Sequence, residues 1–205
     1  SSISSSSEDE NTTKLLQHIA NEAGFNTDFE YIEDVGFNEE GIFKGEESFE
    51  FWFKLIPWED IAIDESELSL ILTQIMNNKK AIIFNPAYTL MFQSKGFMKI
   101  LWDLYPNHPL LLETSFEPLE GKKQVEKRCF GREGANIKII EADGSIEVET
   151  KGDYEGHKAI YQEYTELPTD DEGNSYQAGV FYVYEGAGLG FRKGSKILDD
   201  YAKFV

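Results

Sequence analysis

A local concentration of positive charge and glycine is the first candidate for chemistry in this chain. Between Gly121 and Lys138, six basic side chains stand against two acidic ones, although the whole protein carries a net charge of −19. The bases are Lys122, Lys123, Lys127, Arg128, Arg132 and Lys138. Among them lies a glycine-containing turn, Gly131-Arg132-Glu133-Gly134-Ala135-Asn136.

Such a turn is suited to binding an anion. Glycines let backbone N–H groups approach and surround a ligand, and a guanidinium group matches phosphate oxygens. The alternative is a hairpin turn with ordinary surface bases. The pattern by itself favours that alternative, because two glycines three residues apart are common in turns.

Other single residues are weaker candidates. Glu185–Arg192 is rich in glycine but joins strands instead of opening a helix, so it is not a dinucleotide fingerprint. Its alternative is a hairpin with Arg192 facing solvent. Lys95 is by itself more typical of a surface lysine, and His108, in a proline-flanked turn, of a structural histidine. No second His or Cys lies at a spacing from His108 that would indicate a metal site.

The composition narrows the class of protein. There are 38 acidic and 19 basic residues, which disfavours nucleic acid and anionic membrane as partners. Cys129 is the single cysteine and cannot form an internal disulfide, so a cytoplasmic protein is expected, with Cys129 in a half-buried strand. No apolar run approaches the ~20 residues of a membrane helix. The polar start, residues 1–10, is expected to be a solvated loop, as if the chain opened in the middle of a protein.

Hydrophobic periodicity predicts an α+β fold. Apolar spacing predicts helices over 11–24, 63–77 and 94–104. Aromatic and β-branched runs predict strands over 29–32, 48–56, 80–84, 124–129, 136–140, 146–150, 159–164, 178–184 and 188–192. Residues 11–110 therefore alternate helix and strand, whereas 111–205 are mostly antiparallel β. No linker is rich enough in Gly, Pro or Ser to separate independent domains.

Five ordered motifs resemble the glutathionylspermidine synthase family. They are Phe53–Glu59 (FKLIPWE), residues 86–112 with LWDLYPNHP, Phe130–Ile137 (FGREGANI), Ile160-Tyr161-Gln162 and Gly188–Arg192 (GLGFR). The resemblance implies the C-terminal part of an ATP-grasp ligase, in which two α+β lobes clasp a nucleotide. It also implies an amide-forming reaction: ATP phosphorylates a carboxylate, and an amine displaces the phosphate. The expected partners are ATP, Mg²⁺ and small acid and amine substrates of the glutathione and polyamine type.

The resemblance assigns roles to residues that match its motifs. Lys95 and Lys127 would hold nucleotide phosphates, and the loop formed by Gly131, Arg132, Glu133, Gly134, Ala135 and Asn136 would cover them. Tyr161 and Gln162 would run beside the adenine. Arg192 would be catalytic, facing the transferring phosphoryl group. The motifs depart from the family where Lys127-Arg128 replaces Lys-Pro, Gln93-Ser94-Lys95 replaces Ser-Asn-Lys and Asn85-Pro86 replaces Glu-Pro.

The family's magnesium ligands and a substrate arginine belong to a segment upstream of the matched motifs. None is found in this sequence, so we expect this chain alone to be inactive, with the complete parent active. The family's amidase nucleophile is also upstream and is not Cys129. Two alternatives stay open: a non-catalytic nucleotide-binding or vestigial regulatory domain, and a structural domain whose cations form an interaction surface. The acid, the amine and the oligomeric state are not indicated by the sequence.

Overall fold

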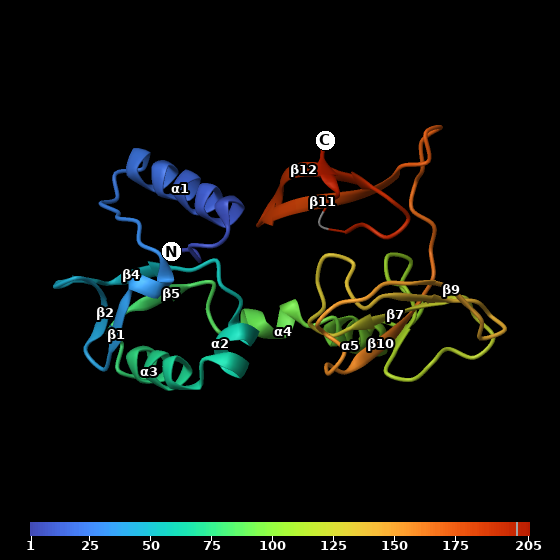
Figure 1. The fold of residues 1–205 in the computed structure, drawn as a ribbon, viewed down its shortest axis with the longest axis horizontal. Coiled ribbons are helices and arrows are strands. Elements are labelled where there is room, and N and C mark those ends of the chain that lie inside the picture. The colour runs from blue at the N-terminus through green and yellow to red at the C-terminus, as the bar shows by residue number, and fades with distance from the viewer. Residues whose placement is uncertain (200) are drawn as a thin grey trace. The chain divides into compact units, whose positions relative to one another are not determined.

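A computed structural model describes residues 1–199 and 201–205 (Figure 1). The chain divides into two compact units, Ser1–Met91 and Phe92–Val205. Both contain helices and strands, so the predicted α+β class is confirmed. None of the helices in the described residues is long and apolar enough to cross a membrane.

The first unit begins with a helix that starts earlier than the sequence pattern predicts. Helix α1 (Ser7–Glu22) includes residues 7–10 of the segment expected to be a loop. The side chain of Ser6 accepts a hydrogen bond from the Asp9 backbone N–H at 3.2 Å, which caps the helix. Acidic residues in the first turn also favour this start, because negative charge stabilises a helix N-terminus.

Two small sheets and two further helices make up the rest of the first unit. Strands β1 (Gly36–Asn38), β2 (Gly41–Lys44) and β3 (Glu47–Phe49) are antiparallel, whereas β4 (Phe51–Phe53) pairs in parallel with β5 (Ile82–Phe84). The predicted helix over 63–77 is two helices, α2 (Trp58–Asp64) and α3 (Ser66–Asn77). They break at Glu65, which has a non-helical backbone with φ −118° and ψ 59°.

The predicted strand over 29–32 is wrong. Tyr31 makes only an isolated parallel bridge with Ser2, and a short 3₁₀ turn, Ile32–Asp34, follows it. Extended residues become a strand only when a partner completes the ladder of hydrogen bonds, and here the pairing stops after one bridge.

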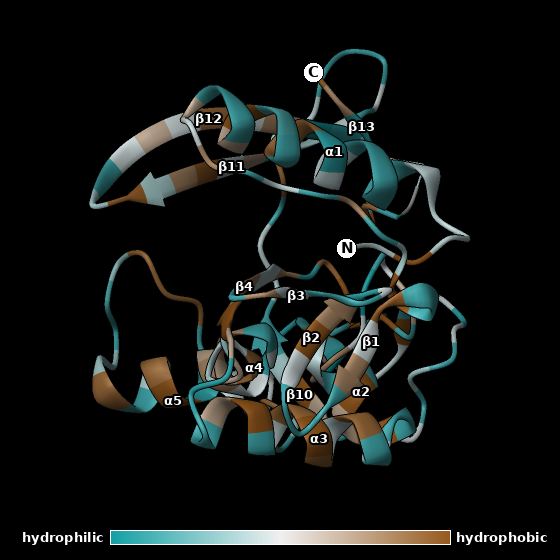
Figure 2. Cartoon of the chain, turned by 90° about the vertical axis from the view of Figure 1, so that its left-hand side faces the viewer, coloured by the Kyte–Doolittle hydropathy of each residue, from teal (hydrophilic) through white to brown (hydrophobic). Residues whose placement is uncertain are grey.

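The core of the first unit lies between α2, α3 and the strands. Its buried members are Ile42, Trp52, Trp58, Ile61, Leu72, Ile75, Ala81 and Ile83. Figure 2 shows hydrophobic residues on α3 and on the neighbouring strands β1 and β2. Lys54 is buried beside this core, with Nζ donating to the Ile56 carbonyl at 2.6 Å and lying 4.1 Å above the Trp58 ring.

The second unit begins within α4 (Thr89–Gln93) and is dominated by antiparallel sheet. After α5 (Gly96–Leu104) the strands are β6 (Thr114–Ser115), β7 (Gln124–Arg128), β8 (Lys138–Ile140), β9 (Ile146–Glu149) and β10 (Ala159–Glu163). They form one sheet in the order β6-β10-β7-β8-β9. A separate sheet contains β11 (Ser175–Val183), β12 (Glu185–Gly194) and β13 (Lys203–Phe204).

Candidate functional site

Lys127 lies in a buried polar chain that crosses three strands of the second unit. Its Nζ donates to Gln162 Oε1 at 2.8 Å, and Gln162 Nε2 donates to Thr114 Oγ1 at 3.1 Å. Lys127 is on β7, Gln162 on β10 and Thr114 on β6. Gln162 is 8% exposed and Thr114 only 1%. Because both ends of the amide are bonded, Gln162 holds the Lys127 ammonium in a fixed position.

Lys95 brings a second amine to the same unit. Its backbone N–H donates to the Cys129 carbonyl at 2.7 Å, and its Nζ donates to the Gly131 carbonyl. Burial lowers the pKa of Lys95. Burial, together with the nearby Lys95 charge, lowers the pKa of Lys127 to about 8. Two amines that are desolvated and close together favour an anionic ligand, which would restore their preference for the charged form.

The Gly131–Asn136 turn joins β7 to β8 and lies beside Lys95. Glu133, Gly134 and Asn136 have left-handed backbones, with φ values of 53°, 69° and 51°. The turn closes on itself through an Ala135 N–H donating to the Arg132 carbonyl at 2.8 Å. Backbones that alternate between right- and left-handed residues can form nests of N–H groups that bind anions, and the left-handed residues make this turn a candidate for one.

Neighbouring residues hold this turn in place. Thr150 Oγ1 donates to the Gly134 carbonyl at 2.6 Å, and the Tyr154 N–H donates to Asn136 Oδ1 at 2.8 Å. A Cβ added to Gly134 would lie 2.9 Å from both Ile197 Cγ2 and the Leu198 carbonyl oxygen. Position 134 therefore requires glycine for its positive φ and for the close approach of this segment.

Arg192 reaches the same 197–199 segment from β12. Its Nη2 donates to the Asp199 carbonyl at 3.1 Å, and its guanidinium carbon lies 5.7 Å from the centre of the Phe204 ring. The Arg192 Nε is buried and has no hydrogen-bond partner among the described residues. Arg192 and Lys127 have different partners: Arg192 bonds to Asp199, and Lys127 bonds to Gln162. Arg192 and the Gly131–Asn136 turn therefore lie against the same segment, residues 197–199. The Arg192 Nε remains as a donor for a ligand.

Tyr161 stands apart from Gln162. Successive strand residues point to opposite faces, and Tyr161 pairs in register with Glu126, whereas Ile160 pairs with Lys127. Burial raises the pKa of Tyr161, and the Glu126 carboxylate adds to that rise. Of the two predicted adenine neighbours, Gln162 therefore shares a sheet face with Lys127 and Tyr161 lies on the other.

Sequence reasoning missed four residues that position the candidate site. They are Thr114, Thr150, Tyr154 and Asp199. Thr114 and Thr150 act through hydroxyl groups, and the other two through a backbone N–H and a carbonyl. The sequence carries no signal for them, because each contact joins residues that are distant along the chain or uses a backbone group.

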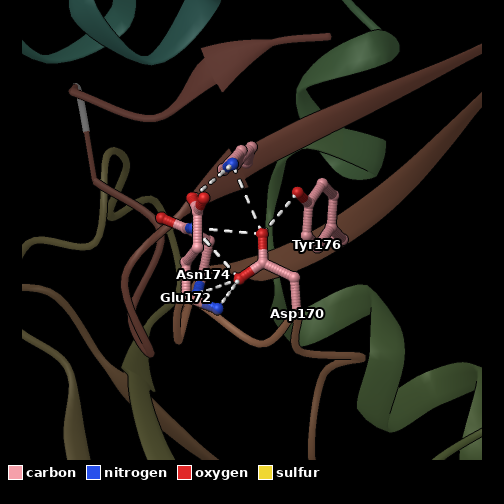
Figure 3. A network of polar contacts seen from close by, with 5 residues as sticks. Asp170, Glu172, Asn174 and Tyr176 are labelled. Atoms are coloured by element: carbon pink, nitrogen blue, oxygen red, sulfur yellow. Dashed lines mark hydrogen bonds and ion pairs between the residues drawn. The ribbon is translucent and has the colours of Figure 1, made fainter.

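A polar network around Asp170 fixes the base of the β11–β12 hairpin (Figure 3). Asp170 accepts hydrogen bonds from the Asn174 N–H and the Tyr176 hydroxyl, both at 2.8 Å, and forms an ion pair with Lys193 at 3.3 Å. The Asn174 N–H is the main cause that holds the pKa of Asp170 well below its usual range, and Tyr176 and Lys193 contribute to the same shift. The network is filled by protein donors, and no group of three or more His, Cys, Asp or Glu in the described part of the chain could hold a metal ion.

Comparison with known proteins agrees with the motifs. A family model described as glutathionylspermidine synthase preATP-grasp matches residues 1–205. A putative acid–amine ligase of Haemophilus influenzae is 31% identical over 176 residues, covering 80% of this chain and 43% of that protein. The bifunctional glutathionylspermidine synthetase/amidase of Escherichia coli is 30% identical over 122 residues, covering 58% of this chain and 19% of that enzyme. The trypanothione synthetase of Crithidia fasciculata is 26% identical over 120 residues, covering 57% and 18%.

These relatives are named as ligases and synthetases, and the chain spans less than half the length of each. The predicted resemblance is confirmed over the full length of the sequence. The chain belongs to the glutathionylspermidine synthase preATP-grasp family.

Proposed function

We propose that this chain is the nucleotide-phosphate-binding part of an ATP-dependent acid–amine ligase with an ATP-grasp architecture. The observation that carries the proposal is the pair of desolvated amines, Lys95 and Lys127, beside the left-handed Gly131–Asn136 turn. The family and the names of the relatives support the reaction class. By analogy with those names, the substrates are an acid of the glutathione type and an amine of the polyamine type, in a cytoplasmic enzyme.

The residues present fit an anionic phosphate ligand. Lys127 is held by Gln162, Lys95 is anchored at the start of α5, and Arg192 has an unused Nε donor. ATP, when bound, supplies the phosphoryl group that activates a carboxylate toward attack by an amine. In this arrangement Lys95 and Lys127 neutralise phosphate charge, residues 131–136 place backbone N–H groups over it, and Arg192 stabilises charge that develops during transfer.

The contacts of Gln162 assign its side chain to positioning Lys127, and not to binding the edge of the adenine ring. Its Oε1 is taken by Lys127 and its Nε2 by Thr114, so the amide orients the lysine before any ligand arrives. A charge-assisted hydrogen bond of this kind reduces the cost of ordering a flexible lysine on binding. The adenine role requires Gln162 to exchange one of these two partners.

Calorimetric titration of ATP into the 205-residue chain, with and without Mg²⁺, tests the proposal. We expect Lys127→Ala to weaken binding by roughly tenfold or more, because a hydrogen bond to a charged group contributes about 1.5–3 kcal/mol. Lys122→Ala is the matched control: it removes the same charge from an exposed lysine paired with Glu113. Equal weakening by both variants, or no binding at millimolar ATP, would count against the phosphate site.

A second candidate function is a non-catalytic nucleotide-binding or regulatory domain. It is favoured because no cluster of three or more acidic, His or Cys side chains in the described part of the chain is arranged to hold a metal ion, whereas phosphoryl transfer by such a ligase uses magnesium. An assay of amine-dependent ADP release separates the two candidates. Release by the complete parent but not by this chain supports the ligase, whereas ATP binding with no release by either supports the regulatory domain.

A further inference from the structure

We propose that Lys127 is an acylation site, at which a small acyl phosphate such as acetyl phosphate transfers its acyl group to the lysine amine. The inference rests on the phosphate site proposed above, because that site would hold the reagent beside Lys127. It goes beyond nucleotide binding, since it assigns to one residue a covalent modification that removes the charge on which the site depends.

The Lys127 side chain is oriented as a nucleophile requires. Its Nζ donates to Gln162 Oε1 at 2.8 Å, and Gln162 is itself held by a 3.1 Å hydrogen bond to Thr114. An ammonium group has three N–H donors and no lone pair, whereas a neutral amine has two N–H groups and one lone pair. One N–H of the neutral amine can therefore stay on Gln162 while the lone pair is available for attack.

The surroundings of Lys127 favour the neutral amine. Burial, together with the Lys95 charge, lowers the pKa of Lys127 to about 8. At pH 7.5 such an amine is neutral in about a quarter of the molecules, against about 0.1% for an ordinary lysine with a pKa near 10.4. The side chain is only partly buried, so a small reagent can reach it.

The groups around Lys127 would hold the phosphate end of the reagent. Lys95 lies near enough for its charge to lower the Lys127 pKa, and its Nζ is held at the Gly131 carbonyl. The Gly131–Asn136 turn, with its left-handed residues, is the candidate nest of N–H groups. In an acyl phosphate a single oxygen atom separates the phosphorus from the acyl carbon. A phosphate bound by Lys95 and the turn would therefore bring that carbon to the Lys127 amine.

The transfer needs no further reactant. The Nζ lone pair forms the amide C–N bond, the bond between the acyl carbon and the bridging oxygen breaks, and inorganic phosphate leaves with that electron pair. The amine loses one proton, which the phosphate or water accepts. An acylated lysine carries no charge. The modified chain should therefore bind ATP roughly tenfold more weakly, as expected for Lys127→Ala.

Acetylation of individual lysines in the 205-residue chain, followed over time by mass spectrometry, tests the proposal. Acetyl phosphate is compared with the N-hydroxysuccinimide ester of acetic acid, which delivers the same acyl group without a phosphate. The preference for Lys127 over the exposed Lys79 should be roughly a hundredfold with acetyl phosphate and roughly tenfold with the ester, because only the phosphate adds binding to the higher neutral fraction. Inorganic phosphate should protect Lys127 and leave Lys79 unchanged.

Two variants separate the contributions of orientation and phosphate binding. Gln162→Glu places a carboxylate against Lys127, which favours the ammonium form, and should slow modification by both reagents roughly tenfold. Lys95→Met removes a phosphate-binding cation and should slow acetyl phosphate by a larger factor than the ester. Circular dichroism checks that both variants fold.

Three outcomes distinguish this proposal from the proposed function. Equal rates at Lys127 and Lys79 with acetyl phosphate, in a chain that binds ATP through Lys127, overturn the acylation site and leave the phosphate site standing. An equal preference for Lys127 with both reagents, without protection by phosphate, overturns both. Selective acetylation that phosphate prevents, in a chain without affinity for ATP, supports the acylation site and overturns the nucleotide function.

Discussion

At the scale of single residues, the most informative group is the ammonium of Lys127. An exposed lysine titrates near pH 10.4, but burial and the neighbouring Lys95 lower the pKa of Lys127 to about 8. The group is therefore partly deprotonated only slightly above neutral pH. A phosphate ligand stabilises the charged form and raises that pKa again.

This shift predicts a pH dependence of ATP binding. Below pH 8 Lys127 is protonated before and after binding, so affinity changes little through this group. Above pH 8 binding must take up a proton, and affinity should fall as pH rises. Calorimetry in two buffers of different ionisation enthalpy should detect the proton uptake at pH 8.5 and little uptake at pH 6.5.

Lys127→Arg is the control for that prediction. A guanidinium stays protonated throughout this pH range, so the variant should lose the proton uptake even if its affinity is lower. Uptake that persists in Lys127→Arg would assign the titration to another group.

At the scale of elements, the turn between β7 and β8 and the loop before β11 position the candidate site. The turn depends on left-handed residues and on contact with residues 197–199. The loop depends on the carboxylate of Asp170, which contacts five protein donors: the Glu172 and Asn174 N–H groups, Asn174 Nδ2, the Tyr176 hydroxyl and Lys193 Nζ. Both are local devices that hold Arg192 and the glycine turn in fixed positions.

Gly134→Ala tests the turn. We expect it to lower the free energy of unfolding by about 1–3 kcal/mol for the left-handed backbone and by more for the clash with Ile197 and Leu198. Gly144→Ala is the matched control, with φ +86° and open space around the added methyl group. Equal losses of unfolding free energy in the two variants, measured by thermal unfolding, would show that residues 197–199 do not limit the space at position 134.

Asp170→Asn tests the loop. Because the pKa of Asp170 is lowered in the fold, its carboxylate stabilises the protein above the unfolded pKa, near 3.9, and this contribution is lost as pH falls below it. At pH 7 the variant should speed hydrogen exchange of the β11–β12 amides, whereas Asp171→Asn should not. The difference between the variant and the original protein should become smaller as the pH falls below 3.9, where protonation of Asp170 removes the contribution of its carboxylate.

At the scale of the whole molecule, the candidate phosphate site belongs to one of the two units. Lys95, Lys127, Gln162 and Arg192 all lie in Phe92–Val205. The candidate phosphate-binding residues of this chain are therefore all within one compact unit.

A polypeptide of residues 88–205, which keeps α4 intact, should bind ATP with the affinity of the full chain. Calorimetry gives the affinity, and circular dichroism checks that the polypeptide has folded. A folded polypeptide with no ATP affinity would mean that the first unit contributes to the site.

The sequence by itself determined the elements whose signals are local. Alternating residues and Gly or Asp turns predicted β7 to β10, and apolar spacing predicted α5, because period and turn chemistry act over a few residues. The same reasoning failed at Glu65, where apolar spacing continues across a backbone break, and at Tyr31, where no partner strand extends the ladder.

Only the tertiary structure decided how the candidate residues meet. The motifs singled out Lys127, Gln162 and Gly134, but the Lys127–Gln162 bond depends on the register between β7 and β10, 35 residues apart. Thr114 and Asp199 enter through contacts that no local pattern encodes. The stacking of Phe51 on Phe84 also depends on long-range pairing, because the parallel register of β4 and β5 places the two rings together on one face. The sequence specifies the types of the residues, whereas strand pairing and side-chain packing set the distances between them.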